Sequence, residues 1–177
     1  MHTFRVARWS WQLRLTSSAA TALAAVTAIV VFEVLSAFGV GPVLRVTAAA
    51  LPLIAIAVAI PLIITGYALT PSALWVARLF SRLEIPLDGV TSAWPDPAVL
   101  RPAKRVFGIS GLFSYSCLCK GQALGRFHFY GTAPARAIVL FRPGRTVVVT
   151  PRSAEDFLAC LGHLHPQITI RPKAPEA

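Results

Sequence analysis

The residues best suited to chemistry in this sequence are three cysteines and four histidines, and their spacing matches no disulfide framework and no metal site. Cys117 and Cys119 are separated by one residue, so on a strand both thiols face the same side, which is poor geometry for a disulfide between them. His128, His163 and His165 could in principle join them around a metal ion, but no second pair with ligand spacing exists. We interpret the cysteines as buried reduced thiols in a reducing compartment, and we predict no metal and no cofactor.

The sequence also lacks the residue patterns that are typical of an enzyme. Ser114, Ser116 and the histidines do not form a recognisable catalytic triad. Gly108 and Gly111 do not form a phosphate-binding loop, because no Lys-Ser pair follows them and no strand leads into a helix there. We predict that the protein is not an enzyme. Catalysis would require a cluster of acid, base or nucleophile that only the fold could assemble.

The elements that must position these residues include membrane helices. Apolar residues make up 55% of the 177 residues, charged residues only 14%, and the mean hydropathy is +0.65. This apolar fraction and this mean hydropathy are too high for an ordinary soluble protein. Residues 46–77 carry no charge, and this run is longer than the roughly 20 residues that cross a hydrocarbon core of about 30 Å. At least one spanning helix is expected.

Two spans are predicted, at residues 15–38 and 43–65, and the Gly-Val-Gly-Pro turn at 39–42 joins them into a transmembrane hairpin spanning 15–65. Pro52 and Pro61 fall inside the second span, where each removes a backbone hydrogen bond, so a kink is expected. A cleavable signal peptide is the alternative for the first span. The apolar run is too long for one, however, and leads straight to the second span.

Glu33 is the single charged residue of the first span, and an acid inside a bilayer needs a partner or a proton. Arg45, just beyond the turn, is the nearest basic residue. We predict an intramembrane ion pair of Glu33 and Arg45 at the outer rim of the hairpin. The alternative is that Glu33 reaches water alone.

Basic residues near the spans predict the orientation of the hairpin. Those outside it are Arg5, Arg8 and Arg14 before the first span, and Arg78 and Arg82 after the second. They outnumber Arg45 between the spans, so the positive-inside rule predicts that both termini are cytoplasmic in a multi-pass protein of the bacterial inner membrane. Residues 1–14 also carry Trp9 and Trp11, and they are expected to form a cytoplasmic flank at the membrane interface.

The segment after the spans predicts a small sheet closed by one helix. Alternating apolar residues predict a strand at 126–130, and β-branched residues around a Pro-Gly turn predict a hairpin of strands at 137–141 and 146–150. We interpret the three strands as a β-meander. The hydroxyl of Ser153 and the acids after it predict a helix at about 154–163.

The rest of this part is predicted in outline. Further strands are expected within 67–69, 74–80 and 83–90, residues 94–102 are expected to be a loop because of their prolines, and residues 166–177 are expected to be a disordered tail.

Two short motifs in this part are distinctive. The first is Arg105-Val106-Phe107-Gly108 with Gly111-Leu112, and the second is Thr150-Pro151 followed by Ala154, Phe157 and Leu161. Their order resembles the bacterial pleckstrin-homology-like (PH) domains. The resemblance covers about 66–164 and implies a membrane α + β fold, in which the two-helix hairpin precedes a PH-like domain at 66–165. That domain is expected to be a small β-barrel of two antiparallel sheets, capped by the C-terminal helix.

The resemblance supplies no catalytic residues, and two features depart from it. Many members have an acidic residue where Arg152 stands here, and Cys117 with Cys119 is not part of the family pattern. These departures affect the expected ligand more than the expected fold.

The net charge of +10 has three possible explanations: binding to nucleic acid, proximity to anionic lipid, and the positive-inside bias of membrane proteins. The sequence has no nucleic-acid signature, so we predict no nucleic-acid partner. We predict a membrane-anchored, non-catalytic binding module that recruits or scaffolds a protein partner at the inner membrane. The alternative is recognition of anionic lipid headgroups by a basic face. The candidate binding residues are Lys104, Arg105, Lys120, Arg126, Arg136, Arg142 and Arg145, with Arg152 following them.

Overall fold

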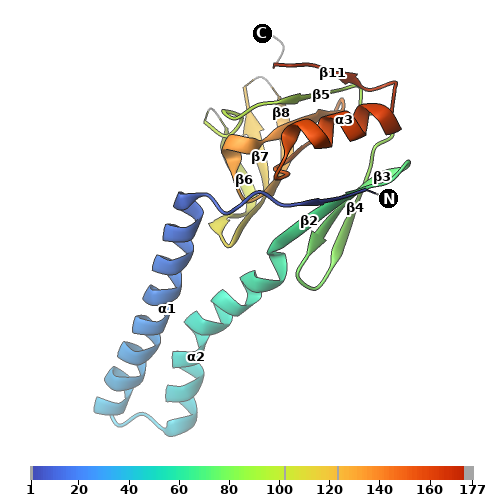
Figure 1. Cartoon of the computed structure of the whole chain (residues 1–177). Coiled ribbons are helices and arrows are strands. Elements are labelled where there is room, and N and C mark those ends of the chain that lie inside the picture. Colours follow the sequence, from blue (N-terminus) through green and yellow to red (C-terminus); the bar gives the residue numbers. More distant parts are fainter. Residues whose placement is uncertain (1, 102, 123, 174–177) are drawn as a thin grey trace.

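A computed structural model describes residues 2–101, 103–122 and 124–173 of the chain. Two long helices project from a sheet-rich domain (Figure 1). Helix α1 (Trp11–Ala37) has 27 residues, and helix α2 (Pro42–Ala59) has 18 and lies beside it. The hydroxyl of Ser10 caps α1 by accepting a hydrogen bond from Leu13 N, and Pro42 starts α2 where no amide donor is needed. Both helices are long and apolar enough to cross a membrane.

The second helix ends earlier than the predicted span, which ran to residue 65. It gives way at Ile60–Leu62 to a short 3-10 helix, η1, and strand β2 begins at Ile64. The predicted kink at Pro61 was therefore wrong, because the α-helix ends at Ala59, before this proline. Pro52 does lie inside α2.

A four-stranded antiparallel sheet follows the membrane helices and includes the start of the chain. Its strands are β1 (His2–Arg5), β2 (Ile64–Leu69), β3 (Ala73–Arg78) and β4 (Arg82–Pro86), in the order β1-β2-β3-β4. Strand β1 pairs with β2 so that Phe4 lies opposite Tyr67. The segment before the first helix is thus more than the predicted flank, because its first residues complete this sheet.

A second sheet has seven strands. They are β5 (Ser92–Pro95), β6 (Lys104–Leu112), β7 (Ser114–Gly121), β8 (Gly125–Gly131), β9 (Ile138–Phe141), β10 (Thr146–Val149) and β11 (Thr169–Ile170). Their order is β11-β5-β9-β10-β8-β7-β6. Strands β9 and β10 form the predicted hairpin. The predicted meander was wrong, since β8 pairs in parallel with β10 and not with β9.

Two further differences concern proline-rich segments. Trp94 and Pro95 were expected in a loop, but they belong to β5, which pairs with β9. The tail was expected to be disordered, but Thr169–Ile170 pairs in parallel with β5, so that prediction was wrong for this part. Residues 174–177 of the predicted tail lie outside the described residues.

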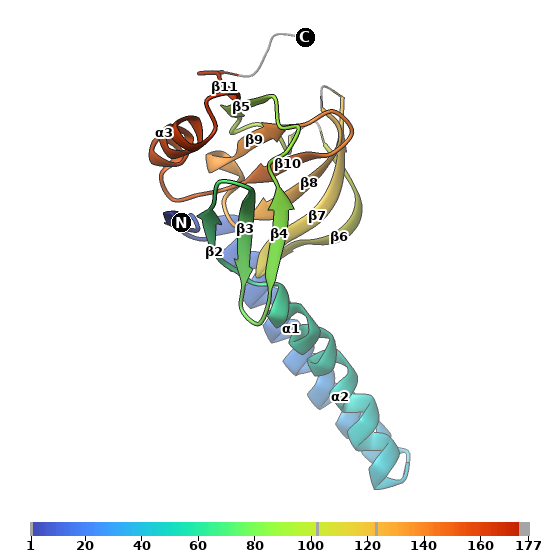
Figure 2. The ribbon, with the colours of Figure 1, turned by 90° about the vertical axis from the view of Figure 1, so that its right-hand side faces the viewer.

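The two sheets pack face to face without closing into the expected barrel, because no ladder between the described strands joins them (Figure 2). Helix α3 (Ala154–Leu164) covers the same core, with Phe157 and Leu161 buried against residues of both sheets. The other face of the larger sheet carries a second apolar cluster, which includes Trp94, Phe127 and Phe129. The two-layer PH-like arrangement with a C-terminal helix was therefore predicted correctly, but the sheets do not close, and the larger one is not purely antiparallel because β8 with β10 and β5 with β11 pair in parallel.

Candidate functional site

One end of the larger sheet is fastened to the membrane helices. Near the β6–β7 turn, Thr16 Oγ1 of α1 donates to the carbonyl of Gly111, and Phe113 N donates to Ser17 Oγ at 2.8 Å. Ser114 Oγ donates to the carbonyl of Leu62 in η1 at 2.9 Å. The β6–β7 turn thus marks the membrane-helix end of the domain, and the β7–β8 turn marks the opposite, distal end (Figure 2).

Basic side chains line up across the strands at that distal end. In the register of the sheet, Lys104 of β6 lies opposite Lys120 of β7, and Lys120 lies opposite Arg126 of β8. The pairing of Thr146 with Phe127 brings Arg145, the preceding residue, next to Arg126. We call Lys104, Lys120, Arg126 and Arg145 the distal basic row.

The distal basic row is long and exposed, and its members form no ion pairs within the described part of the chain. Four neighbouring strands at a spacing of about 4.8 Å extend the row over roughly 14 Å. All four side chains are exposed. Within the residues that the structure describes, no ion pair joins any of them to a carboxylate. Lys120 lies six residues further along strand β7 than Ser114, so the row stands about 20 Å from the membrane-helix end.

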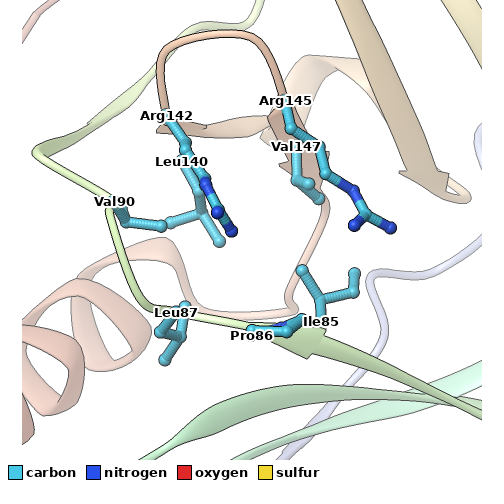
Figure 3. A pocket seen from close by; sticks show the side chains of 8 residues that line it. All are labelled: Ile85, Pro86, Leu87, Val90, Leu140, Arg142, Arg145 and Val147. Atoms are coloured by element: carbon cyan, nitrogen blue, oxygen red, sulfur yellow. The ribbon is translucent and has the colours of Figure 1, made fainter.

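Arg142 extends the row across the β9–β10 turn, toward strand β4. Arg142 and Arg145 both reach from this turn over a small apolar cavity (Figure 3). The cavity is lined by Ile85, Pro86, Leu87, Val90, Leu140 and Val147 in addition to the two arginines. Its volume of about 10 Å³ is the size of one water molecule. The distal end is therefore a charged surface and not a pocket for a small molecule.

A pair of stacked rings lies on the same strand as Arg126. The rings of His128 and Tyr130 are 6.0 Å apart and nearly parallel, and Tyr130 OH lies 3.4 Å from His128 Nδ1. Partial burial, helped by the charge of Arg145, lowers the pKa of His128 below its ordinary value. Burial raises the pKa of Tyr130. Both side chains are thus neutral near pH 7, and the row owes its charge to lysine and arginine.

Arg78 contacts the ring of Tyr130, a contact that the sequence analysis did not predict. It comes from β3 in the smaller sheet, and its guanidinium lies 5.7 Å from the centre of the Tyr130 ring. Its Nη2 donates to Ser116 Oγ at 3.3 Å, while its Nε is buried without a hydrogen-bond partner. Arg78 therefore ties the two sheets together. Nothing in its local sequence distinguishes it from a membrane-flanking arginine.

Two of the seven candidate basic residues lie away from the distal basic row. Arg105 alternates with Lys104 on β6, lies opposite Cys119, and so belongs to the other face. Arg136 lies between β8 and β9, where it donates to the carbonyl of Arg152. The structure thus gathers Lys104, Lys120, Arg126, Arg142 and Arg145 and separates Arg105 and Arg136 from them.

The predicted partners in the membrane hairpin make other contacts. Arg45 Nη1 donates to Ser36 Oγ at 2.8 Å, and its guanidinium lies 5.8 Å from the centre of the Phe32 ring. Glu33 lines an open groove between α1 and α2. The ion pair of Glu33 and Arg45 stays a prediction.

The two neighbouring cysteines point into the second apolar cluster and face the same side, as expected on a strand. Their sulfur atoms are 3.2 Å apart. The hydrogen bond between Cys119 and Cys117, together with the charge of Arg105, lowers the pKa of Cys119 against the opposing effect of burial. Among the described residues, no group of three His, Cys, Asp or Glu side chains is close enough to hold a metal ion.

Comparison with protein families identifies the sheet-rich half of the chain. A family model described as Bacterial PH domain matches residues 65–164, which is more than half of the chain. The chain belongs to the bacterial PH domain family. No curated protein and no solved structure is similar enough to count as a match. The two helices N-terminal to the PH domain fit a membrane anchor.

The PH domain of this chain contains two strands that the family match does not cover. Strand β1 comes from before the membrane helices, and β11 follows the capping helix. Each adds an outer strand to one of the two sheets. The distal basic row lies on β6, β7 and β8 and just before β10, all within the matched region.

Proposed function

We propose that this protein is a membrane-anchored, non-catalytic binding module that holds an acidic protein partner at the inner face of the bacterial cell membrane. Membership of the bacterial PH domain family supports a binding module. The two apolar helices support the anchor. The excess of arginine before α1 and after α2 favours a cytoplasmic PH domain.

The observation that carries the proposal is the distal basic row. Four cations on neighbouring strands, none of them ion-paired to a carboxylate of the described residues, form a surface that attracts acidic side chains and speeds their encounter. The row ends on the edge strand β6, where Phe107 is largely exposed. Exposed aromatic residues commonly become the buried anchors of protein interfaces.

Recognition of lipid headgroups in the protein's own membrane is less consistent with this geometry. The headgroup layer on one side of a bilayer is roughly 5–8 Å thick, and screening limits electrostatic attraction to about 8 Å at physiological salt. The row stands about 20 Å from the membrane-helix end, which is beyond both lengths. A protein partner in the cytoplasm has no such restriction.

A charge-reversal experiment tests the proposal on the full chain in nanodiscs. Proteins captured from the native cytoplasm are compared for the parent chain, the double variant Lys120→Glu/Arg126→Glu, and the control Arg136→Glu, which changes a basic residue away from the row. Losing exposed ion pairs and adding repulsion amounts to roughly 1–2 kcal/mol, so we expect about a tenfold weaker interaction for the double variant only.

Each possible result has a defined meaning. A partner that carries an acidic surface and binds the control as well as the parent supports the proposal. Equal capture by all three proteins contradicts it. Nanodiscs made of neutral lipid are also mixed with separate anionic vesicles. If the double variant loses binding to these vesicles and no protein is lost, the row recognises lipid in another membrane and the proposal is overturned.

A further inference from the structure

The lengths of the two long helices define where the bilayer surface meets the PH domain. Helix α2 has 18 residues, or about 27 Å, which nearly matches a hydrocarbon core of about 30 Å. Its end at Ala59, and η1 after it, therefore lie at the boundary of the core. Helix α1 has 27 residues, or about 40 Å, so about seven residues at its start extend beyond the core. The two helices place the boundary at the same level, because Ser17 and Leu62 both bind the β6–β7 turn.

A second turn of the PH domain is attached at this level. Leu79 N, at the start of the β3–β4 turn, donates to the carbonyl of Ile63 at 3.0 Å, one residue after η1. The turn is closed by a hydrogen bond from Arg78 N to the carbonyl of Ser81 at 2.8 Å. Figure 2 shows the β3–β4 turn beside the domain end of α2. The turn is thus held at the boundary by its backbone.

Two of the side chains of this turn, Leu79 and Phe80, are apolar and exposed on the surface of the domain. Leu79 is 45% exposed and Phe80 is 76% exposed. Exposed apolar side chains gain free energy when they leave water, at about 25 cal/mol per Å² of buried apolar surface. Arg82, two residues after Phe80, is exposed as well and would meet the headgroups.

We infer that the β3–β4 turn inserts Leu79 and Phe80 into the interfacial layer of the bilayer beside α2. The occupant of this apolar surface is lipid, because the turn is hydrogen-bonded to Ile63, at the end of the second membrane helix and at the level of the bilayer boundary. The contact holds the PH domain against the membrane at a third point, in addition to the two helices. It requires the helices to cross a bilayer but does not require any protein partner, so it is independent of the distal basic row.

The inference is tested by measuring the depth of the turn. The variants Phe80→Cys and Ser72→Cys are each labelled with an environment-sensitive fluorophore in the full chain, in nanodiscs that contain lipids with a quencher high on the acyl chain. Ser72 is an exposed residue in the β2–β3 turn at the other end of the same sheet, so it is the matched control. The parent chain is treated in parallel to subtract reaction at the native thiols.

We expect the label at position 80 to lose most of its fluorescence to the quencher and to emit at shorter wavelength, while the label at position 72 changes in neither respect. Because Phe80 contributes little to the core, its replacement should leave the domain folded. Leu79→Cys provides a second probe in the same turn. Equal quenching at positions 80 and 72, or no quenching at 79 and 80, would overturn the inference.

Discussion

Two glycines in β6 explain at residue scale why the Arg-Val-Phe-Gly motif has its form. Gly108 has φ of +101° and Gly111 has φ of +89°. Residues other than glycine rarely adopt such φ values. Gly108 also lies against β7 so closely that a Cβ would be 2.5 Å from the carbonyl oxygen of Ser116 and 2.8 Å from Cys117 Cα. Both neighbours are backbone atoms, so neither can rotate away. Glycine is required at Gly108 for conformation and for space.

We therefore predict that Gly108→Ala destabilises the PH domain by about 1–3 kcal/mol, from the strained backbone and the displaced strand. The measurement is thermal unfolding of the full chain in nanodiscs, followed by near-UV circular dichroism. A control is Gly162→Ala in α3, where an added Cβ meets only Ile170 Cγ1 at an ordinary 3.4 Å. We expect this change to be neutral or slightly stabilising, since alanine favours a helix. Equal melting temperatures for the two variants would contradict the argument.

At the scale of elements, one buried hydroxyl joins the two sheets. Tyr67 of β2 donates its OH to the carbonyl of Tyr130 in β8 at 2.9 Å and accepts a hydrogen bond from Thr150 N at 3.2 Å. Burial raises the pKa of Tyr67 to about 12, so the hydroxyl keeps its proton over the physiological range and remains a donor. This contact takes the place of a ladder between the sheets, because no described strand of one sheet forms a ladder with a strand of the other.

Replacing Tyr67 with phenylalanine should therefore loosen the packing of one sheet on the other. The change leaves the carbonyl of Tyr130 and the amide of Thr150 buried without this partner, at a cost of about 1–3 kcal/mol each. For a domain of this size, each kcal/mol lowers the melting temperature by about 4–8 °C.

The matched control is Tyr115→Phe, since among the described residues Tyr115 makes a ring contact with Phe129 but no hydrogen bond through its hydroxyl. Calorimetry of both variants in the same detergent provides the comparison. A Tyr67→Phe protein as stable as Tyr115→Phe would show that the hydroxyl does not join the sheets.

The elements predicted correctly from the sequence are those whose signals are local. The β9–β10 hairpin follows from a Pro-Gly turn between two apolar runs, and α3 follows from the Ser153 cap and its apolar face. The pairings that were missed join distant residues, such as β1 with β2 and β8 with β10. Such pairings depend on how the whole sheet assembles, and alternation within one strand carries no information about its neighbour.

The same reasoning applies to the candidate site. Each member of the distal basic row was recognised from its charge, but the row itself depends on register. Shifting β7 by one residue against β8 would turn Lys120 to the opposite face of the sheet, so that it would no longer lie beside Arg126. Arg105 and Arg136 carry the same charge, and only the fold separates them from the row.

At the scale of the whole molecule, the start of the chain packs against its final helix. The rings of Phe4 in β1 and Phe157 in α3 are 5.3 Å apart in an edge-to-face arrangement. Next to them, Val6 bridges to Pro151, and Ala7 N donates to the carbonyl of Thr150 at 3.0 Å. The segment before the membrane helices is thus built into the PH domain.

We predict that Phe4→Ala lowers the stability of the PH domain by roughly 1–2 kcal/mol, less than the 3–5 kcal/mol of a fully buried phenylalanine, since Phe4 is half-buried. Chemical denaturation of the full chain in detergent, monitored by near-UV circular dichroism, measures the change. Trp11→Ala serves as the control, because this aromatic residue lies in the same part of the chain but is 71% exposed. Indifference to Phe4→Ala would mean that the N-terminal strand does not support the domain.

Strand β1 also has a consequence for biogenesis. Residues 2–5 leave the ribosome before either long helix, yet their partner strand β2 is made after both. Whenever the helices enter a bilayer, the sheet can be completed only if the chain crosses an even number of times. A molecule with a single crossing leaves β1 and β2 in different compartments and β2 with an unpaired edge. The opening residues thereby couple completion of the sheet to correct insertion, and a fusion partner added ahead of them would have to be accommodated beside this strand.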